Sequence, residues 1–278
     1  MTHRSRQLPI IPGDLAKSLA SARVRLFVGS GVSSAASLTS WDKLITEMKI
    51  VIETESNTYS NEDLESFFAK SDHLEIADVF KATVQDHRYY SFLRSHYRRD
   101  VPLSKLHRAI SRLPITTIFT TNYDKLLERA YRDRNGIDPP VIIFPEQLGY
   151  IEDTSIRIIK LHGDIDHPKT VVLTRMDYAN YGSRHREFEQ KFHNSVNEYT
   201  MLFVGFGLRD PNFKRIYYDA RGLYDSGKRL AYAIMTDTNQ VERDLWEKDQ
   251  LKILPAKSYS QVATIIEEIR ASAKVGSP

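Results

Sequence analysis

Residues 25–34 read Arg-Leu-Phe-Val-Gly-Ser-Gly-Val-Ser-Ser, an apolar run that leads directly into a turn of glycine and serine. The run at 24–28 is too short for a helix and is typical of a strand buried on both faces of a parallel sheet. We therefore expect the turn at the strand's carboxyl end, where Gly29 and Gly31 would let the backbone approach a ligand. The helix that follows could be capped by serine hydroxyls, those of Ser30, Ser33 and Ser34.

This turn permits two interpretations. The N–H groups at a helix N-terminus favour a bound phosphate, which makes the loop a candidate nucleotide site. However, the loop lacks the third glycine of the usual dinucleotide fingerprint, and a tight strand-to-helix turn would have the same composition. The stretch alone leaves both interpretations open.

The composition indicates an ordinary globular protein. The chain has 278 residues, of which 41% are hydrophobic, and a formal net charge of +3 with the charges of both signs intermixed. Direct binding of nucleic acid is not expected, because no basic stripe is present. The absence of cysteine excludes disulfides and cysteine zinc sites and fits a reducing compartment. No run is long enough to span a membrane and residues 1–7 precede no apolar core, so we expect a cytoplasmic protein.

Apolar periodicity changes along the chain in a way that predicts an α/β fold. Residues 57–111 show only helical spacing and predict a helical insertion lobe after the first strand–helix unit. Elsewhere strands alternate with helices, so the class is a Rossmann-like, mostly parallel sheet. Trp41 falls at helical spacing and is expected in the core. The remaining predictions are a helix at 14–20 capped by Asp14, a strand at 171–173, a helix from 174 through 192, strands at 230–235 and 251–254, and helices at 241–248 and 261–273.

Two further strands are predicted to end in polar residues. Residues 115–121 form a β-branched strand followed by Asn122 and Asp124, and residues 156–161 form a strand followed by His162 and a glycine. In an open parallel sheet, ligands bind at these carboxyl ends. The alternative is that Asn122 or Asp124 only caps the next helix, and that His162 is structural.

Residues 201–211 have the same pattern as the first loop, an apolar strand followed by two glycines, here Gly205 and Gly207. These glycines could let a phosphate or ribose approach. Residues 222–229 nearly spell a Walker A loop, but Arg229 replaces the hydroxyl residue that would bind magnesium and the glycines precede a strand. We expect a helix end and turn there, and no phosphate site.

Four segments, taken in this order and at these separations, resemble the signatures of the sirtuin superfamily, and more closely its bacterial branch, the sirtuin-like domains of antiviral defence proteins. They are residues 29–33, 121–124, 161–163 and 205–207. The resemblance runs from about residue 20 to about residue 270. It implies one sirtuin-like catalytic domain over residues 1–278 that binds NAD as its substrate. No metal is expected, because the chain has no cysteine and its near-Walker loop lacks the hydroxyl residue.

The resemblance also implies roles for individual residues. Asn122 would hold the nicotinamide ribose and the attacking water, Asp124 would orient the carboxamide, and His162 would act as general base. The nucleotide would be bound by residues of three of these segments: Gly29, Ser30, Gly31, Ser33, Thr121, Gly205 and Gly207.

Departures from the family narrow the activity. True protein deacylases carry a four-cysteine zinc lobe, which a chain without cysteine cannot build. We therefore predict an NAD glycohydrolase that depletes NAD in antiviral abortive infection. The alternatives are a zinc-free NAD-dependent deacylase or ADP-ribosyltransferase, and a module that senses NAD or ADP-ribose without turnover.

Control is expected to come from outside the catalytic fold. The fold and its lobe account for residues 20–270, which would leave no sensor domain, so we expect a homo-oligomer or a separate defence partner that handles nucleic acid. The lobe could supply the interface through exposed side chains, or these could only cover its own core: Tyr89, Tyr90, Tyr97, Arg98 and Arg99.

Overall fold

The computed structural model describes residues 8–150, 156–207, 214, 217–219 and 230–275. Within these residues, seven parallel strands form one sheet in the order β3-β4-β2-β1-β5-β6-β7. The chain crosses from one side of β1 to the other, which creates the switch point where such sheets bind ligands. The strands are β1 (Val24–Val28), β2 (Thr117–Thr120), β3 (Val141–Ile142), β4 (Arg157–Lys160), β5 (Thr200–Val204), β6 (Ala231–Thr236) and β7 (Leu251–Ala256).

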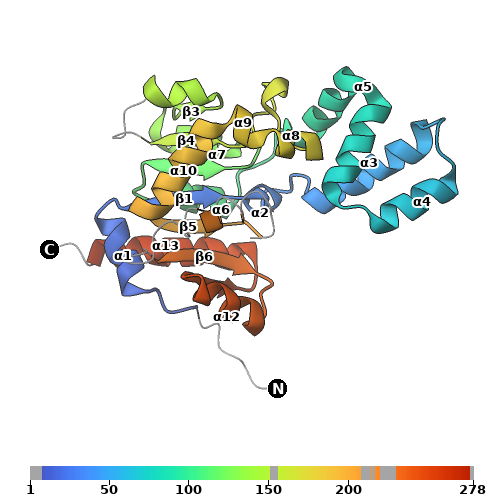
Figure 1. Ribbon diagram of the computed structural model, residues 1–278. Helices are drawn as coiled ribbons and strands as arrows, with labels where there is room; N and C mark the ends of the chain where they lie inside the picture. The colour runs from blue at the N-terminus through green and yellow to red at the C-terminus, as the bar shows by residue number, and fades with distance from the viewer. Residues whose placement is uncertain (1–7, 151–155, 208–213, 215–216, 220–229, 276–278) are drawn as a thin grey trace.

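Helices cover both faces of this sheet and form a lobe beside it (Figure 1). The α-helices are α1 (Gly13–Ala20), α2 (Ser30–Ser34), α3 (Trp41–Glu55), α4 (Asn61–Lys70), α5 (His73–Tyr97), α6 (Lys105–Ser111), α7 (Leu126–Asn135), α8 (Arg175–Ala179), α9 (Tyr181–Arg184), α10 (Arg186–Glu198), α12 (Gln240–Lys248) and α13 (Tyr259–Val275). Two short 3₁₀ helices are η1 (Pro145–Tyr150) and η2 (Pro168–Thr170). Among the described helices, none is both long and apolar enough to cross a membrane.

Strand β1 lies at the centre of the sheet and is buried along its whole length, as its sequence predicts. Val24, Leu26 and Val28 enter the core on one face, which they share with α1, α6 and α13. Phe27 enters the core on the other face, where Phe192 of α10 contacts its ring edge-on. The period-2 alternation thus gives each face its own core, which explains why both faces need a helical cover.

The lobe consists of α3, α4 and α5, which pack around a core that also includes Tyr123, Ile165, Val171 and Leu173 from the loops at the strand ends (Figure 1). It differs from the expected range 57–111 at both ends. Helix α3 precedes that range but packs against α5, and α6 lies within it but packs against α7 and α13 of the sheet layer. Helix α5 bends at Gln85, whose backbone leaves the helical region. The lobe is therefore built around the α3–α5 contact.

The lobe aromatics expected on an interface are largely internal. Tyr89 and Tyr97 are buried in the lobe core and Tyr90 packs against it. Arg98 forms an ion pair with Asp166, 3.2 Å between Nε and Oδ1. The second interpretation, in which these residues cover the lobe's own core, therefore holds for the tyrosines.

Several local predictions were wrong. Residues 171–173 are extended but join no strand of the sheet, because Val172 N–H donates to the carbonyl of His162 instead. The helix expected from 174 through 192 is divided into α8, α9 and α10. Asp14 does not cap α1, since Pro12 is the N-cap and the Asp14 carboxylate accepts a hydrogen bond from Tyr232. The two-residue strand β3 was not predicted, and the near-Walker stretch at 222–229 lies outside the described residues.

Candidate functional site

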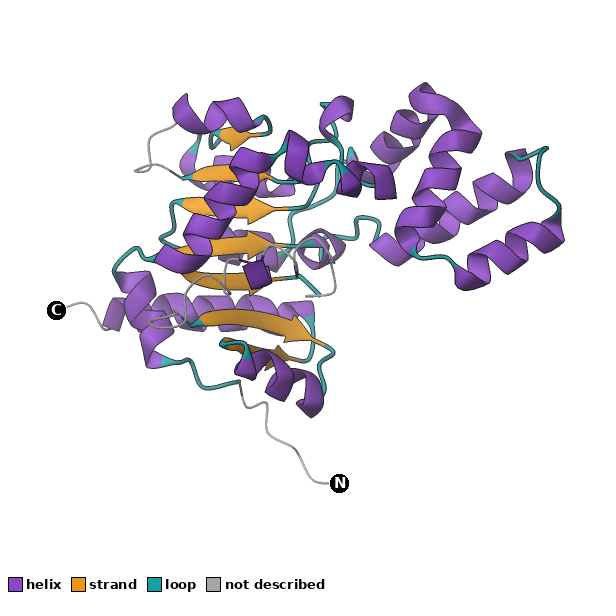
Figure 2. Cartoon of the chain, in the orientation of Figure 1, coloured by secondary structure: helices purple, strands orange, loops and turns teal. Residues whose placement is uncertain are grey.

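A pocket of about 700 Å³ lies at the carboxyl ends of β1, β2 and β4, between the sheet and the lobe. Figure 2 shows the strand arrowheads pointing toward this side of the molecule. The sheet wall of the pocket is formed by Ser30, Ser33, Thr121, Asn122, Tyr123, Asp124, His162, Tyr178, Phe206 and Gly207. The lobe wall is formed by Thr39, Trp41, Asp42, Ser71, Asp72, His73, Leu74 and Tyr97.

The structure brings together most of the residues singled out in the sequence. Seven of them line this one pocket, although they are distributed over four separate segments: Ser30, Ser33, Thr121, Asn122, Asp124, His162 and Gly207. Gly29, Gly31 and Gly205 are not part of the lining.

These three glycines pack against one another behind the pocket. Gly31 N–H donates to the Gly205 carbonyl at 2.8 Å, and Gly205 has a φ of +64°. A Cβ at Gly29 would lie 2.5 Å from the Gly205 oxygen. The glycines are therefore required for the contact between the β1 and β5 loops, a role that the sequence pattern did not distinguish from ligand approach.

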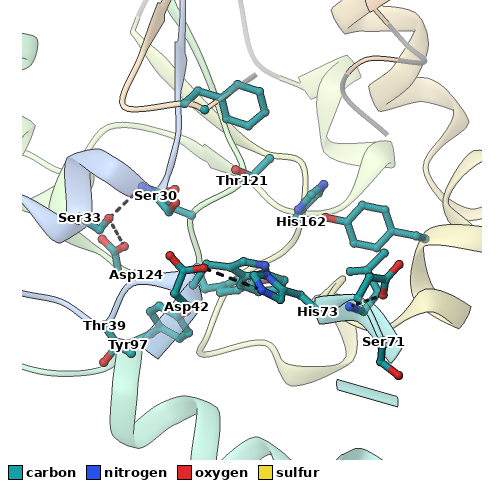
Figure 3. A pocket seen from close by; sticks show the side chains of 18 residues that line it. Ser30, Ser33, Thr39, Asp42, Ser71, His73, Tyr97, Thr121, Asp124 and His162 are labelled. Carbon is teal, nitrogen blue, oxygen red and sulfur yellow. Dashed lines mark hydrogen bonds and ion pairs between the residues drawn. The ribbon is translucent and has the colours of Figure 1, made fainter. Parts of the chain in front are cut away.

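A hydrogen-bonded chain of three buried side chains crosses the sheet wall (Figure 3). Asn122 Nδ2 donates to Ser33 Oγ at 2.8 Å and to the Gly29 carbonyl at 3.1 Å, and Ser33 Oγ donates to Asp124 Oδ2 at 2.5 Å. Because Nδ2 is engaged, the amide is fixed with its oxygen away from these partners. That oxygen, Asn122 Oδ1, is buried and accepts no hydrogen bond from any described residue.

The serine hydroxyls do not cap α2 as expected. Gly29 is the N-cap and has no side chain to offer, while Ser33 is committed to Asn122 and Asp124. Asp124 directly precedes Lys125, the N-cap of α7, and its Oδ1 accepts from the N–H of Leu126, the first residue of the helix, at 2.9 Å. Asp124 thus binds the start of the helix without being its N-cap residue, and it also lines the pocket.

His162 is held in place by aromatic neighbours. Its ring meets those of Tyr178 and Tyr181 edge-on, with centroid separations of 5.3 and 5.8 Å. Gly163, with a φ of +84°, turns the chain directly after it, and a Cβ there would lie 2.1 Å from the Thr170 carbonyl oxygen. His162 and Asn122 are 5% and 7% exposed, so both of these strand-end side chains are buried.

The lobe wall was mostly missed in the sequence, although its elements carry local signals. Thr39 Oγ1 lies 3.1 Å from His96 Nδ1, and His96 Nε2 lies 3.4 Å from a Glu47 carboxylate oxygen. Burial lowers the pKa of His96, which keeps the ring neutral near pH 7. Trp41 packs against the lobe core, as predicted, and it also lines the pocket, which was not predicted.

Tyr97 and His73 complete the lobe wall. Burial, and secondarily the charge of Asp124, raises the pKa of Tyr97, so its phenol keeps its proton. His73 Nε2 lies 3.9 Å from Asp42 Oδ1, and its ring centroid is 6.1 Å from that of Trp41. Figure 3 shows His73 and Asp42 on the same side of the pocket. Among the described residues, no group of three or more His, Asp or Glu side chains is arranged to hold a metal ion.

A parallel sheet with a switch point at β1 and a polar pocket at its strand ends defines a Rossmann-like α/β class of protein, in which ligands bind at this edge of the sheet. A family model described as "SIR2-like domain" matches residues 116–254, and the chain belongs to that family. A crystal structure of a Sir2 homolog–NAD complex has the same fold, with a TM-score of 0.53 and 13% identity over 98% of each chain.

Curated relatives come from bacteria. The NAD(+) hydrolase ThsA of Bacillus cereus (strain MSX-D12) is 26% identical over 94% of this chain and 56% of its own length. ThsA of Enterococcus faecium is 28% identical over 79% of this chain and 44% of its own. Defense-associated sirtuin 2 of Bacillus subtilis is 25% identical over 88% of this chain and 24% of its own. The chain thus spans about half the length of the ThsA relatives it matches.

Proposed function

We propose that this protein is an NAD glycohydrolase, which cleaves NAD to nicotinamide and ADP-ribose. The observation that carries the proposal is the buried chain Asn122–Ser33–Asp124, which shares one pocket with His162. An amide whose nitrogen is held by two acceptors, and whose own oxygen has no partner among the described residues, is suited to accept a hydrogen bond from a hydroxyl or water at a fixed position. The NAD(+) hydrolases among the relatives support this choice of substrate.

For this reaction the protein must hold NAD in place and exclude bulk water from the reacting bond, and acid catalysis is less important. The bond between the ribose carbon and the nicotinamide nitrogen breaks through an oxocarbenium-like transition state. The bonding electron pair leaves with the nitrogen and neutralises the pyridinium, so no group has to protonate the leaving group. Water then attacks the ribose carbon and its proton passes to His162, while Asn122 Oδ1 accepts from the ribose hydroxyl or the water.

Asp124 and the surrounding residues would hold the dinucleotide. The Asp124 carboxylate, kept in position by Ser33 and Leu126, would orient the carboxamide. Ser30, Thr121 and Gly207 are available from the pocket lining to contact the phosphates and the adenosine half. Gly29, Gly31 and Gly205 would act through the shape of the two loops they join, since none of them lines the pocket.

Incubation of the pure protein with NAD tests the proposal, with nicotinamide and ADP-ribose measured as products. We expect both to appear without an acyl-lysine peptide and at an unchanged rate in the presence of a metal chelator. Product formation that requires the peptide would indicate a deacylase, and ADP-ribose attached to protein would indicate a transferase. Binding without turnover would indicate a sensor. Activity that is lost in chelator and restored by zinc or magnesium would reveal a metal site.

We further propose that the chain works in the cytoplasm as an effector of antiviral defence that depletes NAD. Its control would come from self-assembly or from a defence partner that handles nucleic acid. The names of the relatives support the defence role. The proposal predicts that specific activity rises with protein concentration or on addition of the partner, and a strictly monomeric protein with constant specific activity would contradict it.

A further inference from the structure

A fully buried lysine lies behind the two loops that carry Asn122 and His162. Lys160 is the last residue of β4, two positions before His162, and its side chain is 1% exposed. A charged ammonium group has a large desolvation cost in such a place, so its partners must compensate closely. The nicotinamide cleavage proposed above assigns no role to this residue.

The ammonium group of Lys160 binds both loops at once. Nζ donates to the Asp124 carbonyl at 2.5 Å and lies 3.3 Å from the Tyr123 carbonyl. Tyr123 and Asp124 are the two residues that follow Asn122 in the chain. It also lies 2.7 Å from Asp164 Oδ2, two residues after His162. A single side chain therefore spans the backbone of one loop and the carboxylate of the other.

Side chains of both charges surround this lysine: Glu128, Asp164 and the half-buried Lys125. Lys160 Nζ pairs with Glu128 Oε1 of α7 at 2.8 Å, and Lys125 Nζ reaches Asp164 Oδ2 at 2.6 Å. Burial acts to lower the pKa of Lys160, but Glu128, Asp164 and Asp124 together outweigh it, and the pKa is raised. Burial likewise acts to raise the pKa of Asp164, and Lys160 and Lys125 outweigh it, so the pKa is lowered. Lys160 and Asp164 are therefore both charged at neutral pH.

An apolar side chain of similar volume would stabilise a protein interior about as well as a buried ion pair, so stability alone does not explain a lysine here. Its value lies in direction, because its three N–H groups bind the Tyr123 and Asp124 carbonyls and Asp164 Oδ2 and so fix their relative positions, while Glu128 contributes its charge. The other buried cation of β4 provides a contrast. Arg157, at the opposite end of the strand, donates from Nε to Thr117 within the sheet and contacts neither pocket loop in the interactions described.

We propose that Lys160 is a positioning residue, which sets the distance and orientation between Asn122 and His162 by fastening their two loops to one nitrogen. Glu128 and Asp164 keep the ammonium charged and centred. The inference rests on the proposed function for its catalytic consequence, but its structural consequence can be measured without turnover.

The test compares Lys160→Met with Arg157→Met, which removes a buried cation from the same strand far from the pocket loops. Kinetics of nicotinamide release give kcat and KM, thermal melting gives the folded fraction, and hydrogen exchange by mass spectrometry follows residues 121–126 and 161–165. For Lys160→Met we expect kcat to fall by about tenfold to a hundredfold with KM changed by less than about threefold, because misplacement of the reacting groups affects the transition state most. Exchange should accelerate in both loops together, whereas Arg157→Met should lower stability and leave both loops protected.

Glu128→Gln, which keeps the shape and removes one charge, carries the test if Lys160→Met does not fold. It should give the same pattern with a smaller kcat loss. A folded Lys160 or Glu128 variant whose kcat and loop exchange match those of Arg157→Met would overturn the inference. If the wild-type protein releases no nicotinamide, the proposed function fails, and the exchange of the two loops decides the positioning role by itself.

Discussion

The two walls of the pocket are built on different principles. On the sheet wall, Ser33, Asn122 and Asp124 bind one another, and these three side chains and His162 are all less than 8% exposed. Most of the lobe wall lies at the starts of α3 and α5, where the side chains of Asp42 and His73 are 89% and 43% exposed, whereas Thr39 and Tyr97 are buried. The buried part of the sheet wall therefore has one arrangement fixed by packing, while the exposed helix starts of the lobe wall can adjust. We infer that the sheet wall performs the chemistry and that the lobe wall governs access and affinity.

The largest effect that tests this division should come from the sheet wall. Asn122→Ala and His162→Ala are each expected to lower kcat for nicotinamide release by about a hundredfold or more, since they remove groups that act on the transition state. Asn122→Ala also leaves the Gly29 carbonyl without its side-chain donor, so we expect a loss of about 1–2 kcal/mol in unfolding free energy.

A matched control separates the catalytic loss from any loss of stability. His193→Ala removes a partly buried histidine of α10 that does not line the pocket, and it should leave kcat unchanged. Near-normal turnover in a folded Asn122 or His162 variant would show that the chemistry lies elsewhere.

The sheet wall could be predicted from the sequence because its signals are local. A buried strand that stops at a polar residue fixes both the edge of the sheet and the position along it, so residues such as Asn122 and His162 are brought together by topology alone. Strand β1 was predicted at its observed bounds. The order of the strands and the hydrogen bond from Ser33 to Asp124 could not be predicted, because they depend on contacts between segments far apart in the chain.

The lobe wall was largely unpredictable for the opposite reason. Residues 71–74 have no glycine turn and follow no strand, and they reach the pocket only because α5 packs against α3. The capping box of Asp72 and Glu75 marks where a helix begins but says nothing of what that helix faces. Similarly, residues 171–173 have the composition of a strand, yet their backbone binds His162 and Tyr123 instead of the sheet.

Acid unfolding should show whether the sheet side or the lobe loses stability first. His107 of α6, on the sheet side, is 1% exposed, and burial lowers its pKa from 6.5 to about 4. As the pH falls below 6.5, His107 takes up a proton in the unfolded chain, whereas in the folded chain it does so only near pH 4. The folded state therefore loses stability as the pH falls from about 6.5 to about 4. A shift of this size corresponds to about 3 kcal/mol.

Urea unfolding of the wild type and of His107→Gln at about pH 7 and about pH 4 measures this contribution. The variant should lose less stability between the two conditions, because it has no proton to gain at this position. Equal losses in both proteins would assign the acid sensitivity to other groups, among them His96 in the lobe, whose pKa burial also lowers.

A smaller effect, on affinity, is expected from the lobe wall. Trp41→Ala should raise KM for NAD by about tenfold with kcat changed by less than about threefold, because an aromatic face in the pocket contributes stacking and apolar contact to the bound rings. Lys43→Ala, on the same helix but outside the pocket lining, is the control and should leave both constants unchanged. A fall in kcat without a rise in KM would contradict the assignment of chemistry to the sheet wall and affinity to the lobe wall, since the lobe would then take part in the chemistry.

The smallest expected effect concerns whether the lobe wall can open locally while the sheet wall stays closed. Asp72 Oδ1 accepts from the backbone N–H groups of Leu74 and Glu75, and the Glu75 carboxylate accepts from Asp72 N–H, so this capping box fixes the start of α5 at the pocket rim. Asp72→Ala should cost about 1 kcal/mol, and Asp72→Asn, which keeps an acceptor oxygen, should cost less. Hydrogen exchange should accelerate in residues 71–76 of the alanine variant and remain unchanged in residues 121–126. If both segments loosen together, the two walls open as one cooperative unit, and the lobe cannot adjust to a ligand while the sheet wall stays fixed.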